Sequence, residues 1–318
     1  MASRDTKRIA GEASSGMTTP ETIWEVPEPL STLEAPVGAG TVITVRRHGN
    51  PNGPRLVLGH GNGLAIDLYY PFWSLLSDEF DILAYDLRNH GWNPVGPIED
   101  HTVPQMARDQ DAILEAIEQH YGAKPTIGVF HSISALPTLL SPRQGSRFSA
   151  LMMFDPPLRR PGISQDEFDR ASIRTAGLAT RRSQHFRTRA AYIELLRFSP
   201  NYRQVVDGVR ELLAETTLRE SPDGNGYDLR CPPAYEAKII EYARFFAVLV
   251  DLSELQCPVK VIGADPTLPY AYLPTFDFGE MVSVDYDFLP DATHFLQLEQ
   301  PQVCADLLRE FLGQHGCL

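Results

Sequence analysis

Short, almost wholly apolar runs alternate with amphipathic stretches in this chain, and this alternation is the feature that most limits how it can fold. The runs at 55–59, 126–130 and 150–154 lack the polar alternation of a half-exposed strand, so we expect each to be buried on both faces. Segments with apolar residues at helical spacing separate them, for example 65–80 and 103–122. Strands alternating with helices in this way indicate a mostly parallel sheet that is flanked by helices.

The alternation stops in the middle of the chain and then resumes. Arginine-rich amphipathic segments such as "RAAYIELLRF" fill residues 157–255, and strand-like runs return with "PVKVIG" and "MVSVDYDFL". We therefore predict a sheet domain made of residues 37–156 and 256–318, with a helical cap or lid, residues 157–255, inserted into it. Residues 1–36 are predicted to be a disordered leader and N-terminal extension.

The composition limits which kinds of molecule the protein is expected to bind. The 41 acidic residues outnumber the 28 basic ones, which argues against nucleic acid or an anionic membrane as the main partner. With no apolar run of eighteen residues and no apolar core near the N-terminus, we expect a cytoplasmic protein, and the sequence leaves a homodimer open. The cysteines form no CxxC pair or metal-ligand spacing, and no nucleotide-binding motif appears, so we predict free thiols, no metal and no cofactor. These cysteines are Cys231, Cys257, Cys304 and Cys317.

Polar clusters follow the predicted strands at the points where the strands end. In an open parallel sheet, ligands bind beyond the carboxyl ends of the strands, so these clusters are expected to share one edge. In chain order they are "HGNG", "DLRNHGW", "HSIS", "FDPP" and "DATHF".

Ser132 is the candidate nucleophile. A strand, His-Ser and then a helix match a nucleophile elbow, the tight turn that exposes a serine hydroxyl, although a serine that caps a helix is the simpler alternative. The Ile133 N–H, at the start of that helix, and the Asn62 N–H would then stabilise an oxyanion. Gly61 and Gly63 would let the backbone approach the substrate oxygen closely.

The motifs "LGHGNG", "YDLRNHG", "HSISA" and "ATHFLQLEQP" give the chain a resemblance to the α/β-hydrolase superfamily over roughly residues 40 to 315. With the insertion, which contains "GYDLRCPPAYEA", it resembles more narrowly a branch that includes mycophenolic acid pathway acyl-CoA hydrolase and fungal toxin-biosynthesis hydrolases. This resemblance implies an α/β-hydrolase fold with an inserted cap. One residue departs from the pattern: Phe130 stands two before Ser132, where the family has a small residue. Either the turn opens, or Phe130 occupies a pocket that accommodates it.

The remaining members of a catalytic triad are His294 and an acid. His294 lies in a loop before the last helix, and the resemblance implies that it is the base. Asp155 follows the strand after the elbow, where some family members have their acid, and it is the preferred candidate. Asp265 follows the penultimate strand, where most members have it, and is the alternative acid. Asp291 is close enough to His294 in sequence to be a loop cap instead.

These residues predict a serine hydrolase that cleaves a carboxylic ester or an acyl thioester through an acyl-enzyme. A serine at the nucleophile position argues against the dehalogenase and epoxide-hydrolase chemistry of this fold, which needs a carboxylate there. Two alternatives stay open: a ligand-binding or receptor-like homologue with little turnover, and acyl transfer to an acceptor other than water. The arginines of the insertion fit either a phosphate-binding surface or an ordinary solvated helix face.

Overall fold

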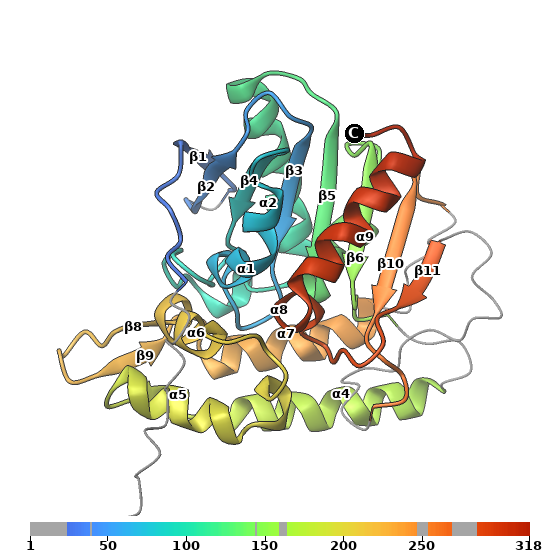
Figure 1. Cartoon of the computed structure of the whole chain (residues 1–318). Helices are drawn as coiled ribbons and strands as arrows, with labels where there is room; N and C mark the ends of the chain where they lie inside the picture. The colour runs from blue at the N-terminus through green and yellow to red at the C-terminus, as the bar shows by residue number, and fades with distance from the viewer. Residues whose placement is uncertain (1–23, 39, 144, 159–163, 247–253, 269–284) are drawn as a thin grey trace, which may run out of the picture.

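An eight-stranded sheet forms the centre of the computed structural model, which describes residues 24–38, 40–143, 145–158, 164–246, 254–268 and 285–318 (Figure 1). The strands lie in the order β1-β2-β4-β3-β5-β6-β10-β11. β2 is antiparallel to both of its neighbours, and the pairs from β4 to β11 are parallel. The strands are β1 (Ser31–Pro36), β2 (Val42–Gly49), β3 (Arg55–Gly59), β4 (Asp81–Tyr85), β5 (Thr126–His131), β6 (Ala150–Phe154), β10 (Val259–Gly263) and β11 (Asp285–Phe288).

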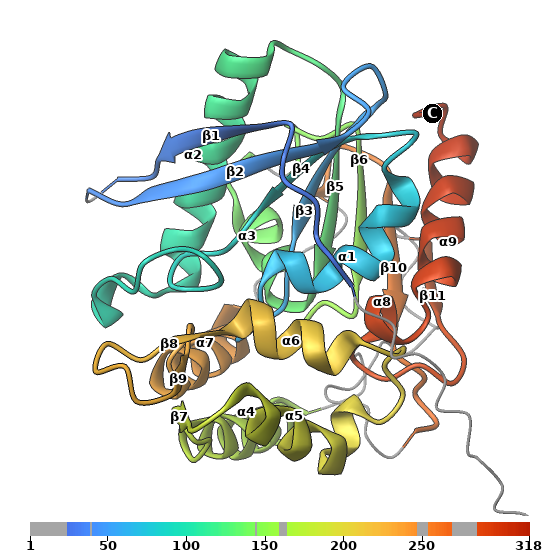
Figure 2. The same ribbon diagram turned by 60° about the vertical axis from the view of Figure 1, so that its left-hand side comes forward.

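Helices cover both faces of this sheet, as the buried strands β3, β4, β5 and β6 require (Figures 1 and 2). α2 and α3 lie on one face, and α1, α8 and α9 lie on the other, so a hydrophobic core fills each side. None of the helices in the described ranges is long and apolar enough to cross a membrane. The helices and 3-10 turns of this part are η1 (Ile66–Tyr69), α1 (Tyr70–Trp73), η2 (Ser74–Leu76), η3 (Ile98–Asp100), α2 (Val103–Tyr121), η4 (Ser132–Ser134), α3 (Ala135–Leu140), α8 (Leu296–Glu299) and α9 (Pro301–Gln314).

A second group of elements is inserted between β6 and β10 and lies across the carboxyl ends of the parallel strands (Figure 1). The sequence predicts its helices, but not its small sheet of order β7-β9-β8. Strands of two or three residues are too short to show a periodicity, and only their pairing defines them. The group comprises α4 (Gln165–Thr180), β7 (His185–Phe186), α5 (Arg189–Phe198), η5 (Pro200–Tyr202), α6 (Val209–Thr217), β8 (Leu218–Glu220), β9 (Tyr227–Leu229) and α7 (Pro233–Phe246).

The two ends of the sheet differ from the prediction in detail. β1 pairs with β2 from Ser31 onward, so the sheet begins before residue 37, the predicted boundary. β1 is an edge strand with one buried residue, and it gives no strong alternation in the sequence. At the other edge, β11 covers 285–288 of the strand predicted over "MVSVDYDFL", whose first four residues lie outside the described ranges.

Candidate active site

Ser132 lies in a sharp turn between β5 and the helix that follows it. Its φ of 53° is in the left-handed region, which a residue other than glycine adopts only when its surroundings hold it there. The Ser134 hydroxyl accepts a hydrogen bond from the His131 N–H at 3.0 Å and donates one to the His131 carbonyl at 2.8 Å. β3 passes close by, since a Cβ on Gly59 would lie 2.7 Å from Cβ of Ser134. The expected strand–serine–helix turn is present.

Phe130, the departure from the family pattern, fits without opening this turn. Its side chain is fully buried and packs edge-on against Phe148, with ring centroids 5.7 Å apart. Two glycines supply the space, because a Cβ on Gly128 or on Gly59 would approach the Phe130 ring to 2.6 or 2.8 Å. Of the two explanations that the sequence left open, the structure therefore shows the second, a pocket that accommodates the ring.

His294 and Asp155 meet at the carboxyl edge of the sheet. His294 Nδ1 lies 2.6 Å from Asp155 Oδ2, and the other carboxylate oxygen accepts a hydrogen bond from the Ala264 N–H at 3.1 Å. Asp155 is 4% exposed and follows β6 directly. A carboxylate only accepts, so Nδ1 donates its proton, and in the neutral form of the ring the lone pair is on Nε2. A neutral imidazole oriented in this way is suited to act as a general base.

Asp265, the alternative acid, is occupied elsewhere. Its Oδ1 accepts hydrogen bonds from the Thr267 N–H at 2.8 Å and the Thr267 hydroxyl at 2.7 Å, and its Oδ2 accepts one from the Asp291 N–H at 2.8 Å. The Thr267 hydroxyl and then the two backbone donors lower the pKa of Asp265. Asp291 itself has a φ of 61° and contributes its backbone to this contact. Asp265 therefore ties its own loop to the loop that leads to His294.

The loop after β3 contains the candidate oxyanion residues. Within the described part of the chain, the N–H groups of Asn62 and Ile133 donate to no protein acceptor. The Asn62 side-chain amide donates to the Glu236 carbonyl at 2.9 Å, which fixes the loop from the side of α7. Position 61 must be glycine, because a Cβ there would lie only 2.8 Å from His131 Nδ1. Gly63 has a φ of 74°, in the left-handed region that favours glycine. Two unused donors beside Ser132 match the arrangement that an oxyanion requires.

A buried chain of hydrogen bonds joins this loop to the histidine loop through Tyr69 and His131. The Gly61 N–H donates to the Tyr69 hydroxyl at 3.0 Å, and the Tyr69 oxygen lies 2.6 Å from His131 Nδ1. His131 Nε2 lies 2.7 Å from the His294 carbonyl, which only accepts, so Nε2 carries the proton and Nδ1 accepts from Tyr69. Burial holds the pKa of His131 well below its ordinary value, which keeps the ring neutral.

The sequence alone does not indicate this role of Tyr69 and His131. Tyr69 is 62 residues from His131 in the chain, and His131 is 163 residues from His294. No local spacing could show such a connection.

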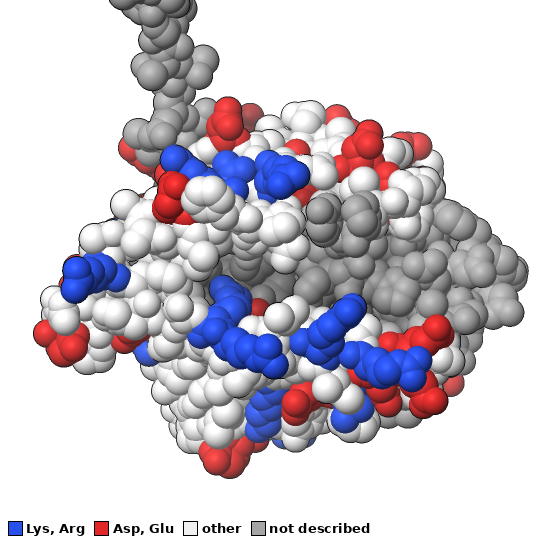
Figure 3. Space-filling model, turned by 90° about the horizontal axis from the view of Figure 1, so that it is seen from below, with Lys and Arg blue, Asp and Glu red and all other residues white. Residues whose placement is uncertain are grey.

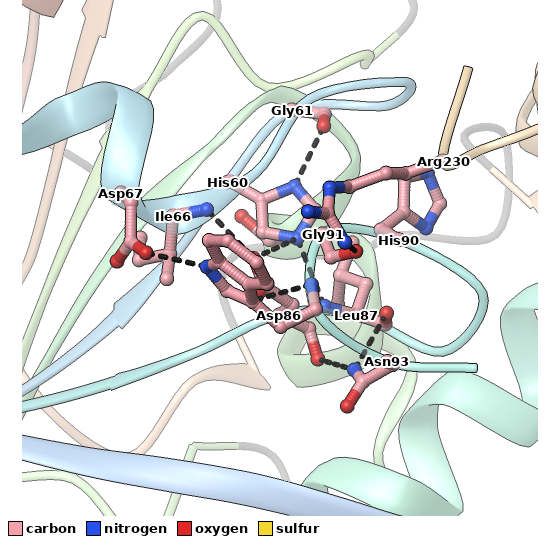
Figure 4. A network of polar contacts seen from close by, with 12 residues as sticks. His60, Gly61, Ile66, Asp67, Asp86, Leu87, His90, Gly91, Asn93 and Arg230 are labelled. Atoms are coloured by element: carbon pink, nitrogen blue, oxygen red, sulfur yellow. Dashed lines mark hydrogen bonds and ion pairs between the residues drawn. The ribbon is translucent and has the colours of Figure 1, made fainter. Parts of the chain in front are cut away.

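The loop after β4 supports the same region from below (Figure 4). His60 Nδ1 donates to the Gly61 carbonyl at 2.8 Å, and its Nε2 accepts from the Leu87 N–H at 2.8 Å. Asp86 accepts from the Ile66 N–H at 2.8 Å and lies 3.1 Å from the Arg46 guanidinium. Burial lowers the pKa of His60, so the ring stays neutral near pH 7 and keeps its hydrogen bonds to Gly61 and Leu87. "DLRNHGW" therefore stabilises the oxyanion loop and lies behind the site.

A cavity of about 460 Å³ opens in front of Ser132 and His294 and is roofed by the inserted elements. Gly61, Asn62 and Ile133 also line it, so all but three of the predicted site residues reach one space. The exceptions are Gly63, Asp155 and Asp265. The Tyr202 ring of η5 stacks on Phe295, next to His294, with centroids 4.9 Å apart. The insertion thus contacts the histidine loop directly.

Buried His90, His101 and Cys231 lie together behind this site, with one potential ligand atom of each within 4.8 Å of the others. Their hydrogen bonds do not fit a metal. Asn89 Oδ1 accepts from the Gly96 N–H at 2.6 Å, so its amide nitrogen donates to His101 Nδ1 at 3.0 Å. His101 must then keep its proton on Nε2, and burial lowers its pKa to about 3. His90 Nδ1 donates to the Arg88 carbonyl at 2.9 Å, so the potential ligands are at most His90 Nε2 and the Cys231 sulfur, fewer than a protein zinc site needs.

The chain belongs to the alpha/beta hydrolase family, whose family model matches residues 56–307. Relatives in sequence match over short segments only. One is "Probable oxidoreductase EphD" from Mycobacterium tuberculosis, 38% identical over 76 residues, which are 24% of this chain and 13% of that protein. Another is "Abhydrolase domain-containing protein ACTT2" from Alternaria alternata, 40% identical over 42 residues, or 13% of this chain and 16% of that protein. The match thus spans a small part of either relative.

Solved structures agree with the family over nearly the whole chain. E-2-(acetamidomethylene)succinate hydrolase superposes with a TM-score of 0.67 and 18% identity, covering 89% of this chain and 99% of its own. The thioesterase domain from the curacin biosynthetic pathway gives a TM-score of 0.65 and 16% identity, with 88% and 99% covered. At such identities the likeness establishes the α/β-hydrolase fold, in agreement with the family model.

Proposed function

We propose that this protein is a serine hydrolase that cleaves a carboxylic ester or an acyl thioester. Ser132 is the nucleophile, His294 the general base and Asp155 the acid that orients His294. The observation that carries the proposal is the 2.6 Å contact between Asp155 and His294 Nδ1, made in a cavity that Ser132 and His294 both line. An isolated capping serine would not require a carboxylate-oriented histidine in front of it.

The proposed reaction begins when the Ser132 hydroxyl oxygen attacks the acyl carbon and its proton passes to His294 Nε2. The carbonyl oxygen becomes an oxyanion, which the N–H groups of Asn62 and Ile133 stabilise. His294 then returns the proton to the departing alcohol or thiol, which leaves an acyl-Ser132 ester. Water attacks this ester with His294 again as the base, and the carboxylic acid is released.

Each residue is held in a way that supports its role. The left-handed backbone of Ser132 is typical of a nucleophile elbow, and a neutral His294 with its proton on Nδ1 has the lone pair of a general base on Nε2. Thr293, the neighbour of His294, donates from its N–H to buried Glu299 at 2.6 Å and also hydrogen-bonds it through the hydroxyl. We propose that residues 157–255 act as a lid that limits water and shapes the acyl pocket.

The test is hydrolysis of matched 4-nitrophenyl acetate, butyrate and octanoate and of the corresponding acyl thioesters. We expect turnover by the wild type and none above background by Ser132→Ala, with unchanged circular dichroism. Ser199→Ala is the matched control, since Ser199 also lines the cavity but lies away from the elbow. A folded wild type that hydrolyses neither class would support a binding protein, and a product formed only with added alcohol would indicate acyl transfer.

A further inference from the structure

The wall of the cavity differs in charge from the protein as a whole. The chain has a formal charge of −13, yet the charged side chains among the described lining residues are Arg182, Arg244 and Glu236, apart from His294. Figure 3 shows the same contrast on the cap face, where Lys and Arg side chains border a hollow. A cleft with one excess sign of charge concentrates ligands of the opposite sign. Arg244 is also paired, at 3.5 Å, with Asp169, which does not line the cavity. The lining itself has two guanidinium groups and one carboxylate, and this excess favours an anionic ligand.

Arg182 is the cation placed to meet such a ligand. It follows α4 and forms an ion pair with Glu236 of α7 through Nη1. The side chain of Arg182 is 33% exposed and that of Glu236 is 13% exposed, so the guanidinium is the more accessible partner. A guanidinium has five donors in a planar fork, so the contacts of Arg182 with Glu236 and with the Tyr192 hydroxyl do not use all of them.

The pair also lies next to the reacting groups. The Glu236 carbonyl accepts from the Asn62 side chain, and its carboxylate is so close to Gly63 that a Cβ there would approach it to 3.1 Å. Arg182 is thus anchored, through Glu236, to the loop that carries the candidate oxyanion donor. A substrate held at Ser132 can place a second polar group within the same enclosed space.

We propose that Arg182 binds a free carboxylate of the substrate, so that the protein prefers esters or thioesters carrying an acid group some bonds away from the scissile carbonyl. The proposal rests on the function proposed above. A carboxylate matches the guanidinium fork and receives charge-assisted hydrogen bonds from it. Glu236 aligns the guanidinium and keeps part of its charge balanced when the site is empty of ligand.

The experiment compares kcat/KM for ester pairs that differ only in charge. For an acid on the acyl side, the pair is 4-nitrophenyl hydrogen adipate and 4-nitrophenyl methyl adipate, with the C5 to C10 diacids as a length series. For an acid on the leaving group, the pair is 4-acetoxybenzoate and its methyl ester. We expect the wild type to favour the acid at least about 10-fold in one of the two pairs.

Three variants test whether Arg182 is the residue that causes the preference for the acid substrate. The ratio should fall to about 1 in Arg182→Gln and in Arg182→Gln/Glu236→Gln, which leaves no unpaired buried carboxylate. Arg174→Gln is the matched control, because Arg174 is an exposed arginine of α4, the helix that Arg182 follows, and does not line the cavity; this variant should keep the wild-type ratio. A wild-type ratio near 1 in both pairs and at every length would overturn the proposal, as would a ratio that survives Arg182→Gln.

Failure of the underlying function has a different signature. If folded wild type hydrolyses none of these esters, the hydrolase proposal fails, and Arg182 is then tested by calorimetric binding of adipate against dimethyl adipate. Adipate binding that is lost in Arg182→Gln and kept in Arg174→Gln supports the anion site independently of turnover. Equal binding of both compounds, or binding of neither, rejects it.

Discussion

Asp155 and Asp265 follow neighbouring parallel strands, β6 and β10, and both are nearly fully buried. Their partners differ completely. The Asp155 side chain contacts the ring of His294, whereas the Asp265 side chain accepts hydrogen bonds from Thr267 and from the backbone of Asp291. Two aspartates that follow neighbouring strands thus have different chemistry, because the loop beyond β11 places a histidine at one and a turn at the other.

Among changes at the two aspartates and at the contacts that hold His294, Asp155→Asn should have the largest effect. The Ala264 N–H would retain the amide oxygen, so the amide nitrogen would face His294 Nδ1. His294 would then carry its proton on Nε2 and could not accept one from Ser132. We expect kcat/KM on an activated ester to fall about 10³- to 10⁴-fold, with an unchanged circular dichroism spectrum. Nearly full activity would mean that Asp155 is not the acid.

Tyr69→Phe tests whether the hydrogen bonds through Tyr69 and His131 position the backbone of His294. The change removes the hydroxyl that joins Gly61 to His131, and His131 holds the His294 backbone. We expect kcat to fall about 10-fold, or about 1.4 kcal/mol, with KM unchanged. Tyr70→Phe is the control, since Tyr70 packs on Trp73 and makes neither contact. Equal effects of the two variants would contradict a positioning role.

The smallest effect on activity should come from Asp265→Asn, which should mainly lower stability. An amide must turn its NH₂ group toward one of the N–H donors that the carboxylate now accepts from, at a cost of about 1–2 kcal/mol. The lowered pKa of Asp265 means that its contribution is fully present above the unfolded pKa of about 3.9 and is lost as pH falls through the folded pKa.

Thermal unfolding of wild type and Asp265→Asn measures this difference. The melting temperature should differ by a few degrees at pH 7, and the gap should close as pH falls below about 4. A loss of kcat/KM as large as that of Asp155→Asn would reverse the assignment of the acid.

The sequence predicts the features that are local. Strands such as β3 and β6 are apolar throughout, and the elbow around Ser132 is a contiguous strand–serine–helix pattern. The family resemblance also predicts His294 as the base, although it is distant from Ser132 in the sequence. The order of the clusters along the chain indicates that they share an edge, since parallel strands all present their carboxyl ends there.

What the sequence could not provide depends on contacts between distant segments. The family resemblance favours Asp155 over Asp265, but the sequence does not show which of the two side chains the His294 loop approaches. Phe130 is acceptable because Gly59 and Gly128 leave room for its ring. Arg182 was one of several arginines in the insertion, and only the fold distinguishes it as the one beside Glu236.

The most direct test of the account is labelling with a fluorophosphonate, followed by intact and peptide mass analysis of wild type, Ser132→Ala and Asp155→Asn. The account predicts a single adduct on Ser132 of the wild type, none in Ser132→Ala, and much slower labelling in Asp155→Asn. No adduct on a folded wild type, or an adduct that persists in Ser132→Ala, would contradict the claim that Ser132 is an activated nucleophile.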